Sequence, residues 1–244
     1  MHEGFSLSSS LHHLKVFTTY PHACSYLDDQ EATTLFVDPK HTIDQRLYTS
    51  LSRMGFRRSG AHVYKPHCHG CKSCIPVRIP VDAFSFSSNQ KRVLRNNKDL
   101  RVSSHSNLDL PAAFDLYDRY IRGRHPDGDM FPPTRDQFDS FLGHAWDCTN
   151  YYFFWREEDL KAVAVVDHLS DGFSAIYTYF DPEDPKRSLG KFVILWQIRL
   201  AQQLRLPYVY LGYWVQSCRK MDYKIQYKPI EILHEGQWQA HEES

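Results

Sequence analysis

The sequence contains Ala175-Ile176-Tyr177-Thr178-Tyr179-Phe180-Asp181-Pro182, followed shortly by Arg187-Ser188-Leu189-Gly190-Lys191, and this stretch decides the fold. Its first part is rich in aromatic and β-branched residues, which predicts a strand that ends at Asp181-Pro182. From Ser188 to Leu204 apolar residues recur at helical spacing and occupy more than one side of the helix. The stretch therefore predicts a strand, a loop and a helix buried by several neighbours.

The start of that helix is a candidate anion site. The first turn of a helix leaves backbone N–H groups without intrahelical acceptors and carries partial positive charge. Arg187 and Lys191 flank it, so a phosphate or a carboxylate would fit there. The alternative is an ordinary capped helix, because serine is common at the N-cap.

The rest of the chain also mixes strands and helices, which predicts an α/β (α+β) fold. A weak junction at 106–111 divides it into two expected domains, residues 1–105 and 106–244. Strands are expected at 14–20, 32–37, 61–64, 75–81, 100–104, 151–155, 162–168, 173–180 and 208–215. Helices are expected at 42–54, 87–98, 110–122, 134–142 and 188–204.

Composition excludes several classes of protein. The chain has 244 residues, 42% hydrophobic and 24% charged, which is globular rather than disordered. Lys plus Arg and Asp plus Glu both number 29, which argues against a protein that coats nucleic acid indiscriminately. No apolar run is long enough to span a membrane, so no membrane partner is expected. Met1–Ser10 lacks the pattern of an export signal, so we expect a cytoplasmic protein in a reducing compartment.

Three of the six cysteines lie within seven residues, in Tyr64-Lys65-Pro66-His67-Cys68-His69-Gly70-Cys71-Lys72-Ser73-Cys74-Ile75-Pro76-Val77-Arg78. A Cys-x-x-Cys-x-x-Cys turn aims several sulfur atoms at one centre, as zinc or an iron–sulfur cluster requires. The fourth ligand is Cys24, or else His67 or His69. Free thiols that are redox-sensitive, or simply packed near a turn, are the alternatives. Cys148 and Cys218 are expected to be small buried residues.

The segment 87–98 carries a local positive charge. Lys91, Arg92, Arg95 and Lys98 lie there, Arg101 follows, and Lys91, Arg95 and Lys98 share a helical face. Arg57 and Arg58 add charge elsewhere in the first half. The cluster is typical of a phosphate-binding surface, and a merely solvated helix face is the alternative.

The segment 208–224 is rich in tyrosine and lysine. It contains Tyr208, Tyr210, Tyr213, Trp214 and Tyr223. These side chains could line a pocket, although their composition alone favours a place in the core.

Together these pieces resemble one family, the aminoacyl-tRNA–protein transferases of the N-degron pathway. The matching segments are Cys24-Ser25-Tyr26-Leu27, the Tyr64–Arg78 run, Tyr177–Pro182, Ser188-Leu189-Gly190, Leu211–Trp214 and Lys220–Lys224. Chain length and cysteine spacing are similar to the bacterial branch, the aspartate/glutamate leucyltransferases. The resemblance implies a GNAT-like acyltransferase core with an N-terminal cysteine-containing α/β subdomain. It also implies transfer of leucine from leucyl-tRNA to proteins that begin with Asp or Glu, which marks them for degradation.

The residues suit that chemistry. The acceptor's α-amine attacks an already activated ester, so the reaction needs no cofactor, and an amine with a pKa of about 7.7–8.0 is partly neutral near pH 7.5. Hydroxyls of Tyr177 or Tyr179, or backbone N–H groups at Ser188–Gly190, would stabilise the oxyanion. Lys220 and Tyr223 complete the candidate catalytic set. Arg78 and Lys224 are candidate partners of the acceptor's carboxylate, and Tyr213 and Trp214 candidate walls for substrate. Lys91, Arg92, Arg95 and Lys98 are the candidate tRNA contacts.

Three other functions remain open at this stage. An arginyltransferase of the same fold would need acids in the donor pocket, for which Asp167, Glu183 and Asp184 are available. A non-catalytic zinc-stabilised module would bind charged and uncharged tRNA equally. An acetyl-CoA-dependent acetyltransferase is disfavoured, because the segment after Asp181-Pro182 lacks a fuller Gly-rich pyrophosphate loop.

Overall fold

The structure is a computed structural model that describes residues 14–241, so the Met1–Ser10 segment lies outside the described residues. The chain forms two compact units. Unit 1 comprises the described parts of Met1–Arg78 and Leu211–Ser244, and unit 2 comprises Ile79–Tyr210. Strands β7 (Cys74–Pro80) and β12 (Tyr208–Val215) each continue from one unit into the other.

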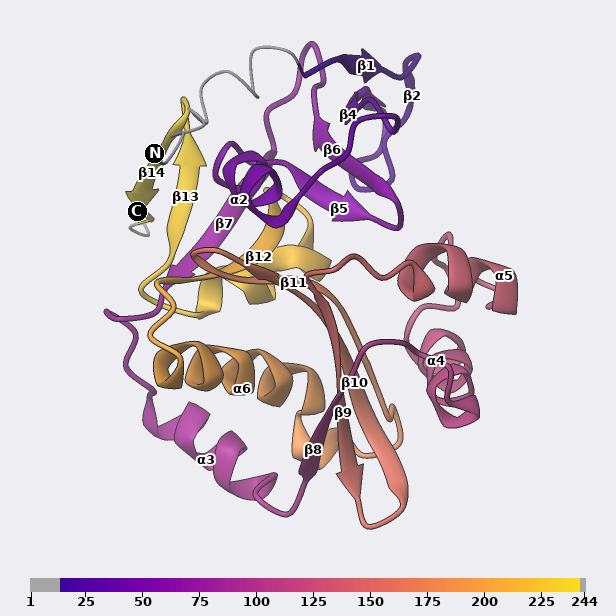
Figure 1. Cartoon of the computed structure of the whole chain (residues 1–244), viewed down its shortest axis with the longest axis vertical. Coiled ribbons are helices and arrows are strands. Elements are labelled where there is room, and N and C mark those ends of the chain that lie inside the picture. The colour runs from indigo at the N-terminus through magenta and orange to yellow at the C-terminus, as the bar shows by residue number, and fades with distance from the viewer. Residues whose placement is uncertain (1–13, 242–244) are drawn as a thin grey trace, which may run out of the picture. The chain divides into compact units, whose positions relative to one another are not determined.

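Unit 2 contains a sheet with strand order β12-β11-β10-β9-β8 (Figure 1). Its strands are β8 (Arg101–His105), β9 (Thr149–Arg156), β10 (Asp159–Leu169) and β11 (Gly172–Phe180), all antiparallel to their neighbours within this set. Helix α6 (Leu189–Gln203) then leads to β12, which pairs with β11 in parallel at Gly172–Ser174. A parallel pair needs such a crossover, and the helix supplies it.

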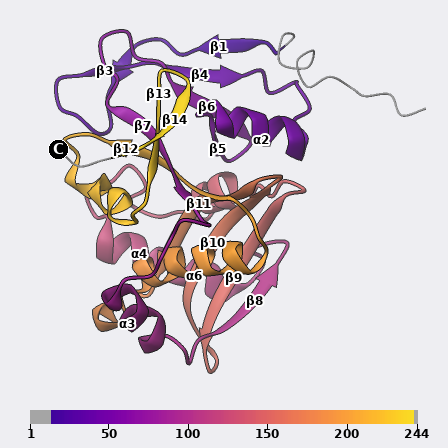
Figure 2. The same ribbon diagram turned by 90° about the vertical axis from the view of Figure 1, so that its left-hand side faces the viewer.

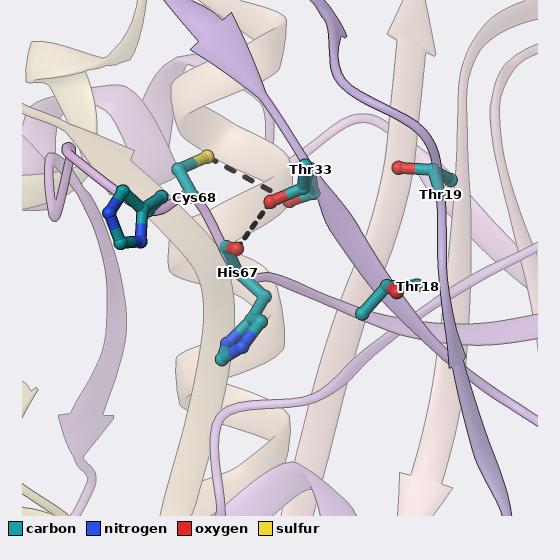
Figure 3. A pocket seen from close by; sticks show the side chains of 6 residues that line it. Thr18, Thr19, Thr33, His67 and Cys68 are labelled. Carbon is teal, nitrogen blue, oxygen red and sulfur yellow. Dashed lines mark hydrogen bonds between the residues drawn. The ribbon is translucent and has the colours of Figure 1, made fainter.

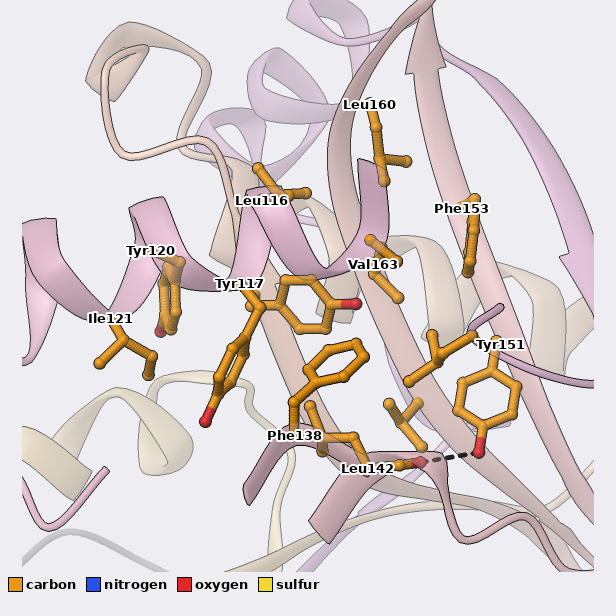
Figure 4. Close-up of a cluster of buried hydrophobic side chains, with 14 residues drawn as sticks. Leu116, Tyr117, Tyr120, Ile121, Phe138, Leu142, Tyr151, Phe153, Leu160 and Val163 are labelled. Carbon is orange, nitrogen blue, oxygen red and sulfur yellow. Dashed lines mark hydrogen bonds between the residues drawn. The ribbon is translucent and has the colours of Figure 1, made fainter. Parts of the chain in front are cut away.

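Helices cover both faces of this sheet. Alternate residues of β9 point to opposite faces, so Phe154 packs on Phe192 of α6 while Phe153 joins the cluster beside α4 (Pro111–Arg124). That cluster also takes in α5 (Arg135–Phe138) and the π-helix η1 (Asp139–Gly143), with Leu116, Tyr117 and Phe138 at its centre (Figure 4). Helix α3 (Ser88–Asn96) lies against α6 (Figure 2).

Unit 1 is built from small sheets. One has the strand order β1-β4-β6-β5, and β2 pairs with β3 as a separate ribbon. Strands β13 (Glu231–His234) and β14 (Gln237–Ala240) pair antiparallel, and β13 pairs with β7. The other elements are β1 (Val16–Thr18), β2 (His22–Ala23), β3 (Glu31–Ala32), β4 (Thr34–Val37), α2 (Gln45–Arg53), β5 (Arg57–Ser59), β6 (His62–Pro66) and the 3₁₀ helix η3 (Arg219–Gln226).

Local sequence explains where the helices begin. Ser87 caps α3 in a capping box, because its hydroxyl accepts from Gln90 N while the Gln90 side chain accepts from Ser87 N. Asp44 caps α2, which therefore starts at Gln45 and not at Thr42 as expected. Pro111 occupies the first position of α4, where its missing N–H costs nothing. The mixed α/β class is confirmed, and the expected elements are present apart from shifts at their ends.

The units divide the chain differently from the sequence-based boundary. Residues 105 and 106 both lie inside unit 2, because β8 pairs along its length with β9. Across the described part of the chain, no helix combines the length and apolar character that crossing a membrane requires.

Candidate functional site

The cysteine run lies in unit 1, between β6 and β7. A pocket of about 390 Å³ opens beside it, lined by Thr18, Thr19, Thr33, His67, Cys68 and His69 (Figure 3). Cys68 Sγ lies 3.8 Å from the Thr33 carbonyl oxygen, and the Thr33 hydroxyl donates to the His67 carbonyl (Figure 3). The wall of the pocket is therefore fixed by contacts between 33 and 67–68.

Other cysteines act electrostatically on the thiol of Cys74. Burial raises the pKa of the Cys74 thiol to about 11, and Cys68, Cys24, Cys71 and Cys218 add to the rise. Cys71 differs, because hydrogen bonding with Ser73 lowers its pKa. All six cysteines are free thiols. Within residues 14–241 no three Cys, His, Asp or Glu side chains are grouped so that they could hold a metal ion, so the four-cysteine centre stays a prediction.

A buried cation lies in the second half of unit 1. Lys224 is 8% exposed and its Nζ donates to the Tyr213 carbonyl at 2.7 Å. Burial, and then the charge of Arg57, lowers the pKa of Lys224 to about 7. Among the described residues no carboxylate pairs with it. A lysine in this state lacks a counter-ion, which a bound anion would supply.

Arg57 on β5 is the second buried cation of this region, and the sequence did not single it out for this role. It is 7% exposed, and Gly212 lets it lie against β12: a Cβ at 212 would come within 3.2 Å of Arg57 Nε. Gly212 also has a φ of +81°, which favours glycine. Arg58 is buried too, so neither arginine extends an exposed basic surface.

Tyrosines surround these cations. The Tyr213 hydroxyl donates to the Gly55 carbonyl at 2.6 Å, and its ring lies 6.0 Å from that of Tyr64. Burial raises the pKa of Tyr64, Tyr213 and Tyr223, and Arg57 opposes the rise in all three. These hydroxyls therefore stay protonated donors at neutral pH.

Other predicted residues of unit 1 have structural partners. Arg78 pairs with Glu231 at 2.7 Å and its guanidinium lies 4.3 Å from the centre of the Trp238 ring. Its charge is already balanced by Glu231, and its predicted contact with the acceptor stays a prediction. The Trp214 indole donates to Asp222 at 3.2 Å, and Lys220 is exposed on η3.

Tyr177 and Tyr179 of β11 lie in different surroundings in unit 2. Tyr179 is fully buried in the cluster beside α4, so its predicted contact with substrate stays a prediction that this packing does not favour. Tyr177 is half-buried, and its hydroxyl lies 3.8 Å from Met130 Sδ. Phe141 packs edge-on to Tyr177, with ring centres 5.3 Å apart. Tyr177, Phe141 and Met130 thus form a half-buried apolar wall, in which Met130 and Phe141 had not been expected.

The start of α6 keeps its backbone donors. Ser188 is the N-cap, but with φ of 52° and ψ of 47° its side chain makes no capping hydrogen bond. Within the described chain, the N–H groups of Leu189, Gly190 and Lys191 have no acceptor. A Cβ at Gly190 would lie 2.8 Å from the Phe180 ring, so this turn packs closely on β11. Arg187, expected to flank an anion here, is paired with Asp99 instead.

Helix α3 and the turn after it present the predicted cations to solvent, because the helix ends at Asn96 and Lys98, expected within it, follows in the turn. Lys91, Arg92, Arg95 and Lys98 are all exposed, while Val93 and Leu94 are buried. Of these cations, Arg92 bonds to Asn89 at 2.9 Å, and none forms an ion pair with an acid in the described part of the chain. The helix therefore offers a field of uncompensated positive charge.

The chain matches one protein family in two adjoining parts. Residues 22–92 match the family described as "Arginine-tRNA-protein transferase, N terminus", and residues 112–234 match "Arginine-tRNA-protein transferase, C terminus". The chain belongs to this family of aminoacyl-tRNA–protein transferases, and it is therefore an aminoacyltransferase.

Two bacterial proteins are similar to this chain over nearly its whole length. A protein of Teredinibacter turnerae named "Aspartate/glutamate leucyltransferase" is 52% identical over 231 residues, 94% of this chain and 95% of its own. One of the same name from Pseudomonas syringae pv. tomato is 50% identical over 230 residues, 94% of this chain and 98% of its own. Among solved structures, L-PGS from Bacillus licheniformis aligns over 70% of this chain and 59% of its own, with 10% identity and a TM-score of 0.49.

Proposed function

We propose that this chain transfers leucine from leucyl-tRNA to the α-amine of proteins that begin with Asp or Glu, and so marks them for degradation. The name shared by the two bacterial relatives supports this activity. The observation that carries the acceptor's identity is Lys224, a buried lysine that meets a carbonyl and no carboxylate within residues 14–241. An acidic first residue supplies the missing counter-ion.

The acceptor's carboxylate binds in unit 1 between Lys224 and Arg57. Two buried cations repel each other, and one anion relieves that repulsion. Charge-assisted hydrogen bonds to carboxylate are strongest where water is excluded. An uncharged first residue such as Asn lacks this attraction, which gives selectivity.

The donor's leucine contacts the apolar wall of Tyr177, Phe141 and Met130 in unit 2, which we propose is a GNAT-like acyltransferase core. Two of the three acids that an arginyl donor could use are engaged elsewhere. Asp167 is fully buried and accepts from the Thr149 hydroxyl at 2.7 Å, and Asp184 pairs with Arg187 at 3.0 Å. The third acid, Glu183, is exposed. The preference for leucine over arginine therefore rests on the apolar wall.

The chemistry requires few protein groups. The neutral α-amine attacks the ester carbonyl, a C–N bond forms, the ester C–O bond to the ribose breaks, and the ribose hydroxyl leaves with the amine's proton. Backbone N–H groups at Leu189–Lys191, with the Tyr177 hydroxyl, are candidates to stabilise the oxyanion. Lys220 and Tyr223 of η3 remain further candidates near the acceptor. Proximity supplies much of the rate.

The tRNA binds through phosphate contacts to Lys91, Arg92 and Arg95 on α3 and to Lys98 in the turn that follows it. Replacing Lys91, Arg92 and Arg95 together by Glu should weaken tRNA binding severalfold at unchanged helicity, because each exposed cation releases counter-ions from the RNA. Unchanged affinity would reject this surface. The reaction takes place in the cytoplasm, where charged tRNA is available.

Cys24, Cys68, Cys71 and Cys74 would hold zinc or an iron–sulfur cluster. Their chemistry fits, since thiols are ligands that zinc and iron–sulfur clusters prefer, and Cys24, Cys68 and Cys71 all act on the pKa of the Cys74 thiol. The metal would tie the start of unit 1 to β7 and takes no part in acyl transfer. Elemental analysis of anaerobically purified protein should give stoichiometric zinc or iron, and a metal-free, fully folded protein would dismiss the site.

An acceptor panel tests the proposal. Leucyl-tRNA is mixed with the protein and peptides that differ only in a first residue of Asp, Glu, Asn or Arg. The expected product is an Asp or Glu peptide heavier by one leucine residue, with little reaction of Asn or Arg. Equal binding of charged and uncharged tRNA with no product would instead indicate a non-catalytic RNA-binding module.

A further inference from the structure

A dense set of hydrogen bonds joins the end of α3 to the loop that enters α6, and no part of the mechanism above uses it. Arg187 makes a two-pronged contact with Asp99, at 2.9 Å to Oδ1 and 2.8 Å to Oδ2. Its Nε donates to Asp184 at 3.0 Å. The Arg187 side chain is 14% exposed and that of Asp99 is 43% exposed, so the contact is buried on the arginine side and open to water on the aspartate side.

Asn97 forms the second half of this link. It is 1% exposed, and its Nδ2 donates to the Val93 carbonyl at 2.9 Å and to the Arg187 carbonyl at 2.8 Å. One side chain therefore holds both the last turn of α3 and the residue just before Ser188. We name Asn97, Asp99, Asp184 and Arg187 the 97–187 clamp.

The clamp lies directly before the start of α6. Ser188, next to Arg187, has a left-handed backbone, which is unfavourable for a residue other than glycine. Such a conformation persists only when its surroundings hold it. Leu189–Lys191, whose N–H groups have no acceptor within residues 14–241, follow directly.

We infer that the 97–187 clamp is a positioning device that fixes the oxyanion-binding start of α6 relative to the tRNA-binding helix α3. The inference rests on the function proposed above. When the body of the tRNA is bound to α3, its aminoacyl end lies at a fixed distance from α3. The clamp sets the matching distance between α3 and the start of α6, both of which lie in unit 2. Its residues bind neither the phosphates nor the ester.

Kinetics of clamp variants test the inference. Asp99→Asn should lower kcat with leucyl-tRNA about tenfold, while KM and the Kd for tRNA change less than twofold. Asp99→Glu should restore much of kcat, and adding Arg187→Gln to Asp99→Asn should cost little more, because both act through one contact. Arg156→Gln is the matched control: Arg156 lies 3.8 Å from Asp99 but outside the clamp, so kcat should not change.

A second measurement does not depend on transfer. Binding of tRNA should slow hydrogen exchange at Leu189–Lys191 in the wild type and not in Asp99→Asn, with equal tRNA occupancy. A wild type that shows this protection but transfers nothing would reject the proposed function and keep the clamp. Any of three results for Asp99→Asn would overturn the positioning role of the clamp. They are a normal kcat, a loss of tRNA affinity as large as that of the α3 variants, and a change in melting temperature with no change in kinetics.

Discussion

Two sets of cations, one in each unit, are held in opposite ways. On α3 and in the turn after it, Lys91, Arg92, Arg95 and Lys98 are exposed to water, with only an Asn89 contact and no acid partner in the described residues. In unit 1, Lys224 and Arg57 are almost fully buried. The sets contain the same residue types, yet their surroundings suit different ligands.

Exposed cations act over a long range, are screened by salt, and suit a large polyanion that contacts many of them at once. Buried cations act over a short range, are protected from salt, and suit a single carboxylate that fits between them. Charge alone therefore does not identify the ligand of a cation cluster, whereas charge together with burial does. Salt should therefore separate the two substrates: it should weaken tRNA binding far more than acceptor binding.

The largest effect should follow from removing a buried cation. Lys224→Met should lower kcat/KM for an Asp-starting peptide by roughly 100-fold or more, since losing one partner of a buried charge pair costs about 2–5 kcal/mol. Lys65→Met is the matched control, because Lys65 also donates to a carbonyl, that of Met54 at 2.9 Å, and its pKa is also lowered by burial. Peptide kinetics at saturating leucyl-tRNA measure both. Equal losses in the two variants would remove Lys224 from the acceptor site.

A smaller effect is expected on the exposed side. Lys91→Gln with Arg95→Gln should reduce the slope of log K for tRNA against log salt by roughly 1.4–1.8, because each cation that no longer meets a phosphate lowers it by about 0.7–0.9. Arg122→Gln with Arg135→Gln also removes two exposed cations, but these pair with Asp118 and Asp139. That control should keep the slope, and an identical change in both double variants would mean that α3 has no special part.

The acceptor site should respond to pH through Lys224. Its pKa of about 7 in the free protein means that the charged form is lost as pH rises through 7. Affinity for an Asp-starting peptide should then fall several-fold between pH 7 and 8. Lys224→Arg stays charged and should show only the titration of the peptide's own amine. Parallel pH profiles for the two proteins would contradict the assignment.

The smallest effect concerns stability. Between pH 7 and 10.5 the unfolded chain holds a proton on Lys224 that the folded chain does not, so this residue makes stability rise with pH across that range. Lys224→Met removes the free-energy cost of burying this amine, so at pH 7.5 the variant should melt several degrees above the wild type. The difference should shrink toward pH 10. A variant less stable than the wild type at pH 7.5 would show that Lys224 is not a strained functional group.

Local rules predicted much of the fold. The Ser87 and Gln90 side chains form the box that begins α3, and the strand expected at 208–215 is β12 with the same bounds. Strands β2, β5, β13 and β14 escaped prediction. β5 has only three residues, two of them arginine, and its pairing with β6 depends on tertiary contacts that no local pattern records.

In the candidate site too, residues set by local patterns could be predicted and residues set by tertiary contacts could not. The exposed cations of α3 follow from helical spacing alone. The place of Arg57 does not, because it depends on the close approach of Gly212, within β12, to the Arg57 side chain. Tyr177 and Tyr179 lie on the same side of β11, yet α4 and α5 bury Tyr179 completely and leave Tyr177 half-exposed. Burial of this kind depends on packing between distant segments. The sequence alone therefore predicted the same role for both tyrosines.

The most direct test of the account supplies two donors to one acceptor. The protein is incubated with an Asp-starting peptide and either leucyl-tRNA or arginyl-tRNA, and the peptide is weighed by mass spectrometry. We expect the wild type to add one leucine and little or no arginine, and Lys224→Met to give no product. Addition of arginine in preference to leucine, or no addition from either charged tRNA, would contradict it.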